Sequence, residues 1–230
     1  MRRLLLVTSI LICLTAFRAV EAQTISCAKA AAPGFWSWAP GSTVSVYVAA
    51  GEFTEDEIAY LLTPLTTWNA AASETGSQVT FEYKGFAEAP LNCTNCLTIT
   101  RGPVFDKKHR HLTELRSLND PRQRTMLWAT IVIDPRLTKR ETLTNAVAHE
   151  LGHSFGLLDC YSCKEKSSVM IQFKSVNTPN HMNGPTAWDV ARVKSLYGAH
   201  VTRAAQKKKI VVDEGEEPVA DDTPIVVPKP

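Results

Sequence analysis

Apolar residues recur with two different spacings in the first part of the chain, and each spacing predicts one element. Val44, Val46 and Val48 alternate with polar residues, as in a half-buried strand, and Gly51 is expected to end that strand. The apolar residues that follow recur at helical spacing. They are Ile58, Leu61, Leu62, Leu65 and Trp68. The pattern therefore predicts a strand followed by a helix.

The predicted helix has its own start signal and one residue that opposes it. Thr54 and Glu57 are spaced as a capping box, in which the two residues satisfy backbone N–H groups of the first turn. Pro64 lacks the N–H group that a helix interior needs, so we expect it to kink or shorten this helix.

Short or alternating apolar runs predict three further strands, at residues 79–83, 97–99 and 127–133. Residues 102–125 are polar and basic without periodicity. Segments of this kind run over protein surfaces, so we expect a long surface excursion there.

The last strong helical pattern contains the residues with the clearest chemical signal. Its expected capping box is Thr138 with Glu141, and the helix is expected to end at Gly156. Within it, His149 and His153 are four residues apart, so their imidazoles can bind one ion from the same face of the helix.

Glu150 and Asp159 complete a candidate catalytic zinc site. Glu150 is rotated off the line of the two histidines, where a general base can reach a water on the metal. Catalytic zinc usually takes three protein ligands, and Asp159 can return to the ion after a sharp turn at Gly156. The alternative is that Asp159 is a simple helix-end or turn residue.

The run HELGHSFGLLD, residues 149–159, resembles the extended zinc-binding motif of the metzincin metallopeptidases. It has Asp where most members carry a third His, the variant seen in snapalysin-type enzymes. Ser168-Val169-Met170 is similar to the metzincin Met-turn, in which the methionine lies beneath the metal. Residues 186–198 resemble the C-terminal helix of the matrixin branch.

This resemblance implies an α+β fold: a metzincin-like catalytic domain in which a twisted mixed sheet packs on the active-site helix, with a Met-turn and a C-terminal helix. It also implies peptide hydrolysis at one zinc ion held by His149, His153 and Asp159, with Glu150 as the base. Met170 would pack beneath the site without taking part in the chemistry. Two alternatives stay open: a catalytically silent secreted zinc-binding or adhesion module, and a zinc hydrolase that acts on non-peptide amides.

Composition and charge restrict the classes of binding partner that we expect. The chain has 230 residues, 44% of them hydrophobic, which is enough for one substantial core. A formal charge of +2 gives no electrostatic reason to propose a nucleic-acid or anionic-membrane partner. We expect a monomer that acts on a protein or peptide, with residues 171–185 forming the pocket wall that sets specificity. Calcium follows from family analogy alone, because no calcium-loop pattern occurs.

Both ends of the chain are expected to lie outside the catalytic domain. Residues 1–22 carry two arginines and then a short apolar run, the pattern of a cleaved secretory signal peptide rather than a membrane anchor. Residues 23–42 would form an N-terminal extension, residues 43–203 the peptidase domain and residues 204–230 a flexible charged and proline-rich tail. The protein is thus expected to be secreted, or periplasmic in a double-membrane bacterium.

Five cysteines remain once that peptide is removed. Cys93 with Cys96 and Cys160 with Cys163 form two C-x-x-C pairs, whose spacing also suits a structural zinc site with four thiolate ligands. An oxidising compartment favours disulfides instead. Because Cys27 is left over, the connectivity stays open, although a Cys160–Cys163 bond would brace the loop after the zinc motif.

Overall fold

The computed structural model describes residues 36–104, 113–120, 125–161, 163–164, 166–171 and 182–198. The predicted signal peptide at 1–22, Cys27, residues 23–35 of the predicted extension and the predicted tail at 204–230 lie outside these ranges. Within them, no helix is both long and apolar enough to cross a membrane.

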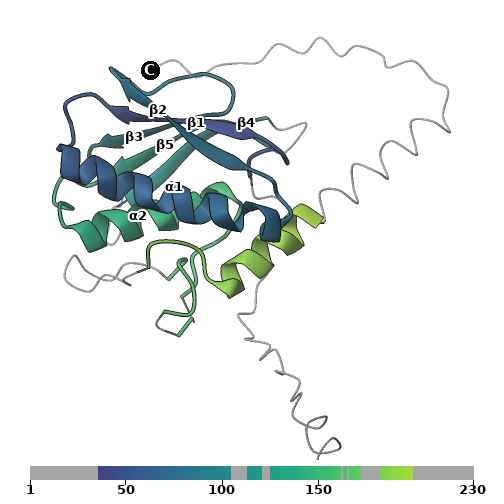
Figure 1. Cartoon of the computed structure of the whole chain (residues 1–230). Helices are drawn as coiled ribbons and strands as arrows, with labels where there is room; N and C mark the ends of the chain where they lie inside the picture. The colour runs from purple at the N-terminus through teal and green to yellow at the C-terminus, as the bar shows by residue number, and fades with distance from the viewer. Residues whose placement is uncertain are drawn as a thin grey trace, which may run out of the picture.

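The described residues contain one five-stranded mixed sheet with helices packed against it (Figure 1). In chain order the elements are β1 (Thr43–Ala49), α1 (Glu55–Thr75), β2 (Thr80–Ala87), β3 (Cys96–Arg101), β4 (Thr113–Asp120), β5 (Thr125–Ile133) and α2 (Arg140–Ser154). The strand order is β2-β1-β3-β5-β4; β4 runs antiparallel to β5, and the other neighbours are parallel. A last helix spans residues 187–198. The predicted α+β class, with a mixed sheet packed on the motif-bearing helix, is confirmed.

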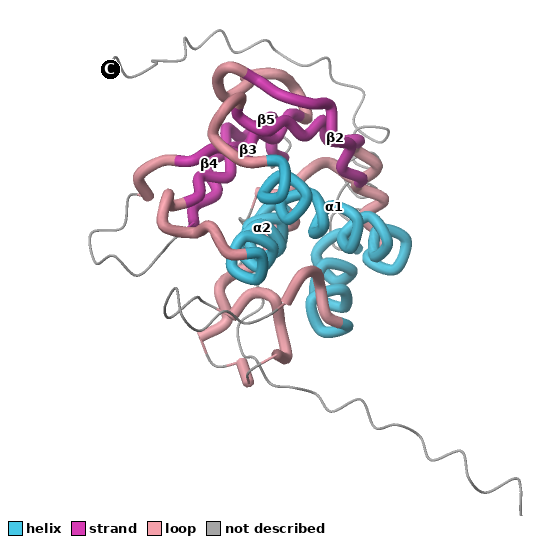
Figure 2. Tube along the Cα trace, turned by 60° about the vertical axis from the view of Figure 1, so that its left-hand side comes forward, coloured by secondary structure: helices cyan, strands magenta, loops and turns pink. Residues whose placement is uncertain are grey.

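Helices α1 and α2 lie on the same face of the sheet, as Figures 1 and 2 show from two directions. The core lies between these two layers. Val44, Val46 and Val48 of β1 are fully buried there, together with Leu61 and Trp68 of α1. The alternating pattern of the first strand and the helical pattern that follows it therefore predict both elements correctly.

Pro64 does not shorten α1, which continues for 21 residues. A proline cannot donate to the carbonyl four residues earlier, which here belongs to Tyr60. The hydroxyl of Thr144 in α2 donates to that carbonyl instead, at 3.2 Å. The expectation of a shortened helix is wrong because the neighbouring helix satisfies the group that the proline leaves free. The capping box of Thr54 and Glu57 is confirmed.

The predicted surface excursion at residues 102–125 contains a strand. In β4, Thr113 lies opposite Ile133 of β5 at one end, and Asp120 lies opposite Thr125 at the other. β4 is the edge strand, and most of its residues are half-buried, so no alternation marks it in the sequence. The expectation is wrong at β4 because backbone pairing with β5, rather than an apolar face, forms the strand.

Helix α2 begins without the predicted capping box. It starts at Arg140, and its N-cap residue Lys139 makes no side-chain cap bond, so the box of Thr138 with Glu141 is wrong. Thr142 donates to the Lys139 carbonyl at 2.8 Å. Twelve of the fifteen residues of α2 are buried. Tertiary packing therefore stabilises this helix in place of a cap.

Candidate metal centre

The C-terminal half of α2 brings two imidazole rings together. His149 is buried and His153 is half-buried. Their ring centroids lie 4.7 Å apart and the ring planes are almost perpendicular, at 88°. A helix turns 100° and rises about 1.5 Å per residue, so four residues place one ring above the other on the same side.

A backbone carbonyl orients each ring. Nδ1 of His149 lies 3.0 Å from the carbonyl oxygen of Val169, and Nδ1 of His153 lies 2.8 Å from that of Leu157. A carbonyl oxygen only accepts hydrogen bonds, so both Nδ1 atoms donate, and Nε2 of each neutral ring carries the lone pair. Histidines that bind metals are usually held in this way.

Asp159 reaches the two histidines because the chain turns at the end of α2. Gly156 has a φ of 86°, the left-handed conformation expected for it, and donates to the His153 carbonyl at 2.8 Å. The chain then returns along the helix end. Oδ1 of Asp159 lies 3.1 Å from Nε2 of His149 and 3.6 Å from Nε2 of His153.

These three side chains fit a zinc ion. One ligand atom from each of them can be chosen so that all lie within 4.8 Å of one another. Ligand atoms about 2.0–2.1 Å from a tetrahedral zinc lie roughly 3.3 Å apart, which is close to the two distances from Oδ1 of Asp159. That oxygen is buried, and the Nε2 atoms of both histidines face it. A cation would satisfy all three atoms at once.

The charges of these three side chains and of Glu150 determine the protonation state of the metal-free site. Burial alone would lower the pKa of His153, but the carboxylates of Asp159 and Glu150 raise that pKa to about 9. Burial alone would raise the pKa of Asp159, but the two histidines hold it well below its usual range. At neutral pH a proton on His153 therefore balances the charge of Asp159, and a metal ion has to displace that proton.

Glu150 lies beside the three candidate ligands, on α2, and is 3% exposed. The hydroxyl of Thr113, the first residue of β4, donates to its Oε1 at 2.5 Å. Within the described part of the chain, the Thr113 hydroxyl is the group that donates a hydrogen bond to the Glu150 carboxylate. Thr113 carries no sequence signal, because it is 37 residues away in the stretch expected to be irregular.

Tyr161 is a second residue at the site that the motif does not name. Its side chain is 76% exposed, and its hydroxyl donates to Oδ2 of Asp159 at 3.3 Å. The negative charge of Asp159, with a smaller effect of burial, raises the pKa of the Tyr161 phenol. The available signal was its place two residues after Asp159, inside a C-x-x-C pair.

Met170 is fully buried and packs against α2. Its sulfur lies so close to Gly152 that a methyl group on that glycine would overlap it. Asp189 holds this segment, because its buried carboxylate accepts from the backbone N–H of Val169 at 2.9 Å. The same carboxylate accepts from Thr186 and so also caps the last helix. The Thr-x-x-Asp spacing was the sequence signal for this anchor.

The four C-x-x-C cysteines are bonded within each pair. The structure joins Cys93 to Cys96 and Cys160 to Cys163, so these thiols do not form a four-thiolate zinc site. The backbone N–H of Cys160 donates to the carbonyl of Met170 at 2.7 Å. The loop that carries the third candidate ligand is thus fixed by a disulfide and by a hydrogen bond to the segment beneath the site.

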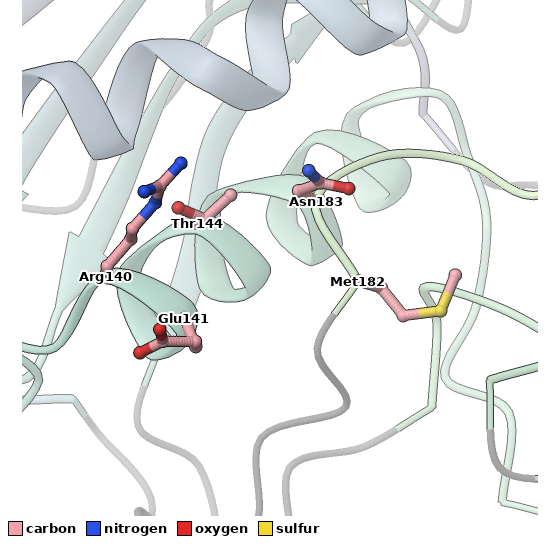
Figure 3. A pocket seen from close by; sticks show the side chains of 5 residues that line it. All are labelled: Arg140, Glu141, Thr144, Met182 and Asn183. Carbon is pink, nitrogen blue, oxygen red and sulfur yellow. The ribbon is translucent and has the colours of Figure 1, made fainter.

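A pocket of about 150 Å³ lies beside the N-terminal half of α2 (Figure 3). It is lined by Arg140, Glu141, Thr144, Met182 and Asn183. Met182 and Asn183 belong to the pocket wall expected at residues 171–185, of which 172–181 lie outside the described residues. Figure 3 shows the charged pair at the start of α2, with these two residues on the facing segment.

Comparison with solved structures finds matches, but their structural similarity and sequence identity to this chain are low. No family of known sequence pattern matches the chain, and no curated protein matches it. The archaemetzincin from Methanopyrus kandleri has a TM-score of 0.44 at 12% identity, over 71% of this chain and 96% of that one. Metalloproteinase-II from Bacteroides fragilis has a TM-score of 0.41 at 15% identity, over 70% of this chain and 56% of that one. Scores this low do not identify a function, so the site has to be interpreted from its own geometry.

Proposed function

We propose that this protein is a secreted zinc metalloendopeptidase. One observation carries the proposal: the ligand atoms of His149, His153 and Asp159 lie within 4.8 Å of one another, beside the buried carboxylate of Glu150. Structural zinc sites usually have four protein ligands, whereas catalytic sites have three and keep one position for water or substrate. Three ligands next to a carboxylate therefore favour catalysis.

The chemistry follows from the donor set and from Glu150. A zinc ion bound here would supply a Lewis acid for a water molecule and for a peptide carbonyl. Oε1 of Glu150 is held by Thr113, so Oε2 is the atom that accepts the proton of the attacking water. Glu150 then delivers that proton to the leaving amine nitrogen. The reaction needs no covalent bond between the substrate and this chain.

An extended peptide is the substrate shape that suits this site. Within the described sheet, β4 is the edge strand next to β5. Extended peptides bind such edges by adding a strand. The hydrogen bond from Thr113 to Glu150 joins the first residue of this strand to the carboxylate that we propose as the base. The pocket beside α2 would receive one substrate side chain.

Secretion is the second part of the proposal. It is supported by the sequence of residues 1–22 and by the two disulfides. Residues 1–22 have the composition of a cleaved signal peptide. Disulfides such as Cys93–Cys96 and Cys160–Cys163 are typical of proteins in oxidising compartments. We therefore place the mature protein outside the cell or in a periplasm, acting on protein or peptide substrates.

The test is cleavage of a diverse peptide library by residues 23–230, with and without a zinc chelator. We expect cleavage that the chelator abolishes and added zinc restores. Glu150→Gln should lower kcat by about 10²–10⁴ because it removes the base, while metal analysis still finds one zinc per chain.

Three outcomes contradict this proposal. Cleavage that survives chelation or the Glu150→Gln change would show that another group performs the chemistry. One zinc per chain without any cleavage would favour the catalytically silent binding module. A wild-type protein that binds no zinc would contradict both the peptidase and the zinc-binding module.

A further inference from the structure

We propose that Thr113 is a positioning residue that fixes the carboxylate of Glu150 for its work as the general base. This inference rests on the proposed function. It concerns a residue of the edge strand, 37 positions from Glu150 in the chain, whose hydroxyl donates to Oε1 at 2.5 Å. Thr113 is 7% exposed and Glu150 is 3% exposed, so water does not compete freely for this contact.

A general base needs a partner of this kind because of the length of its side chain. The last torsion of a glutamate is broad, so helix geometry alone does not determine where the two carboxylate oxygens point. Proton transfer requires one oxygen at about 2.6–3.2 Å from the proton-bearing atom. By holding Oε1, Thr113 sets the plane of the carboxylate and leaves Oε2 to accept the proton.

Thr113 is mounted firmly enough for this task. It is the first residue of β4 and lies opposite Ile133, a fully buried residue of β5. A β-branched side chain has a restricted χ1 torsion, which limits where its hydroxyl can go. Supporting groups on strands position a site more accurately than groups on loops.

The kinetic test compares Thr113→Val, which removes the hydroxyl, with Thr113→Ser, which keeps it. We expect Thr113→Val to lower kcat at least about tenfold with little change in KM, and Thr113→Ser to stay close to wild type. In the Glu150→Gln background, Thr113→Val should cause no further loss. Thr98→Val is the matched control, because Thr98 is a buried threonine of the same sheet whose hydroxyl accepts from Leu91.

The second readout needs neither zinc nor activity. In the metal-free protein we expect Thr113→Val to lower the midpoint of thermal unfolding by about 2–4 °C, since a buried carboxylate loses its donor. In a Glu150→Leu background the same change should have a much smaller effect. Such non-additivity is the signature of a direct contact.

The outcomes separate this inference from the proposed function. A wild-type kcat in Thr113→Val, equal losses in the Val and Ser variants, or a loss of the same size in Thr98→Val would overturn the positioning role while peptide cleavage stands. An additive thermal cycle would overturn the contact itself. If the wild-type protein cleaves nothing, the proposed function fails, and the positioning role fails with it whatever the thermal cycle gives.

Discussion

At the scale of single residues, His153 is the candidate ligand at which a metal ion and a proton would compete for the same atom. Its Nδ1 donates to the carbonyl of Leu157, so a metal and a proton both have to use Nε2. Burial opposes the charged ring, but Asp159 and Glu150 outweigh it and raise the pKa of His153 to about 9. Below that pH, His153 of the metal-free protein is protonated, so the site already carries a positive charge.

The first prediction is therefore a pH-dependent zinc affinity. Because the raised pKa keeps His153 protonated below about 9, apparent affinity should rise by about tenfold per pH unit between pH 7 and pH 9, the effect of one displaced proton. Above pH 9 the dependence should level off. Competition with a chelator of known affinity measures it. In Asp159→Asn, His153 loses its nearest carboxylate, so the dependence should end at lower pH; a wild-type affinity that is flat from pH 7 to pH 9 would contradict the account.

At the scale of elements, α2 depends on a methionine that the chain brings beneath it. Gly152 has no side chain, and the space that a side chain would need is filled by the sulfur of Met170. The ring of Trp68 lies 3.6 Å from the same point. Asp189 in turn fixes the segment before Met170 by accepting from Val169. The last helix thus holds the segment of Val169 and Met170, and Met170 packs against α2.

This packing reverses the usual effect of replacing glycine in a helix. Alanine in a helix interior normally stabilises by about 1 kcal/mol over glycine. Gly152→Ala should instead lower the free energy of unfolding by about 1–2 kcal/mol, because Met170 must leave a filled core position. In a Met170→Ala background the same change should be stabilising, since the added methyl group enters the space left by the sulfur.

Denaturant unfolding of the four proteins measures both effects. Gly198→Ala is the control, because a methyl group at Gly198, the last residue of the last helix, meets nothing within 4 Å. Destabilisation by Gly152→Ala in both backgrounds would show that Met170 is not the obstacle.

Elements also show which parts of the site a sequence can predict. The spacing of His149 and His153 was sufficient to predict that their rings lie together, because helix geometry alone determines that arrangement. Asp159 required one turn, and Gly156 marked it. Thr113 was not predictable, because an edge strand with half-buried residues has no apolar alternation and its partner is distant in the chain. Local geometry thus predicts that His149, His153 and Asp159 come together, whereas tertiary packing brings Thr113 to the carboxylate of Glu150.

At the scale of the whole molecule, residues near both ends of the domain meet in the core. The hydroxyl of Tyr197, in the last helix, donates to the carbonyl of Trp38 at 2.9 Å across 159 residues of sequence. The backbone N–H of Trp38 donates to the carbonyl of Ser154 at the end of α2. Both aromatic side chains are essentially inaccessible to water. Residues 36–42, expected to belong to an extension, therefore include a core residue, Trp38, that contacts both the last helix and the end of α2.

This closure predicts how the protein responds to alkaline pH. Burial raises the pKa of Tyr197, with a small opposing effect of Ser37, so its phenol stays neutral in the folded protein while the unfolded chain ionises near pH 10. The resulting stabilisation is complete below pH 10 and is lost as pH rises above it, because ionisation then favours the unfolded state. Tyr197→Phe should cost about 1 kcal/mol at pH 8 through the lost hydrogen bond, yet decline less steeply above pH 10. Denaturant titrations at pH 8 and above pH 10 test this, with Tyr47→Phe, a change at a half-buried tyrosine of β1, as control. Parallel declines of wild type and Tyr197→Phe would contradict the role of Tyr197.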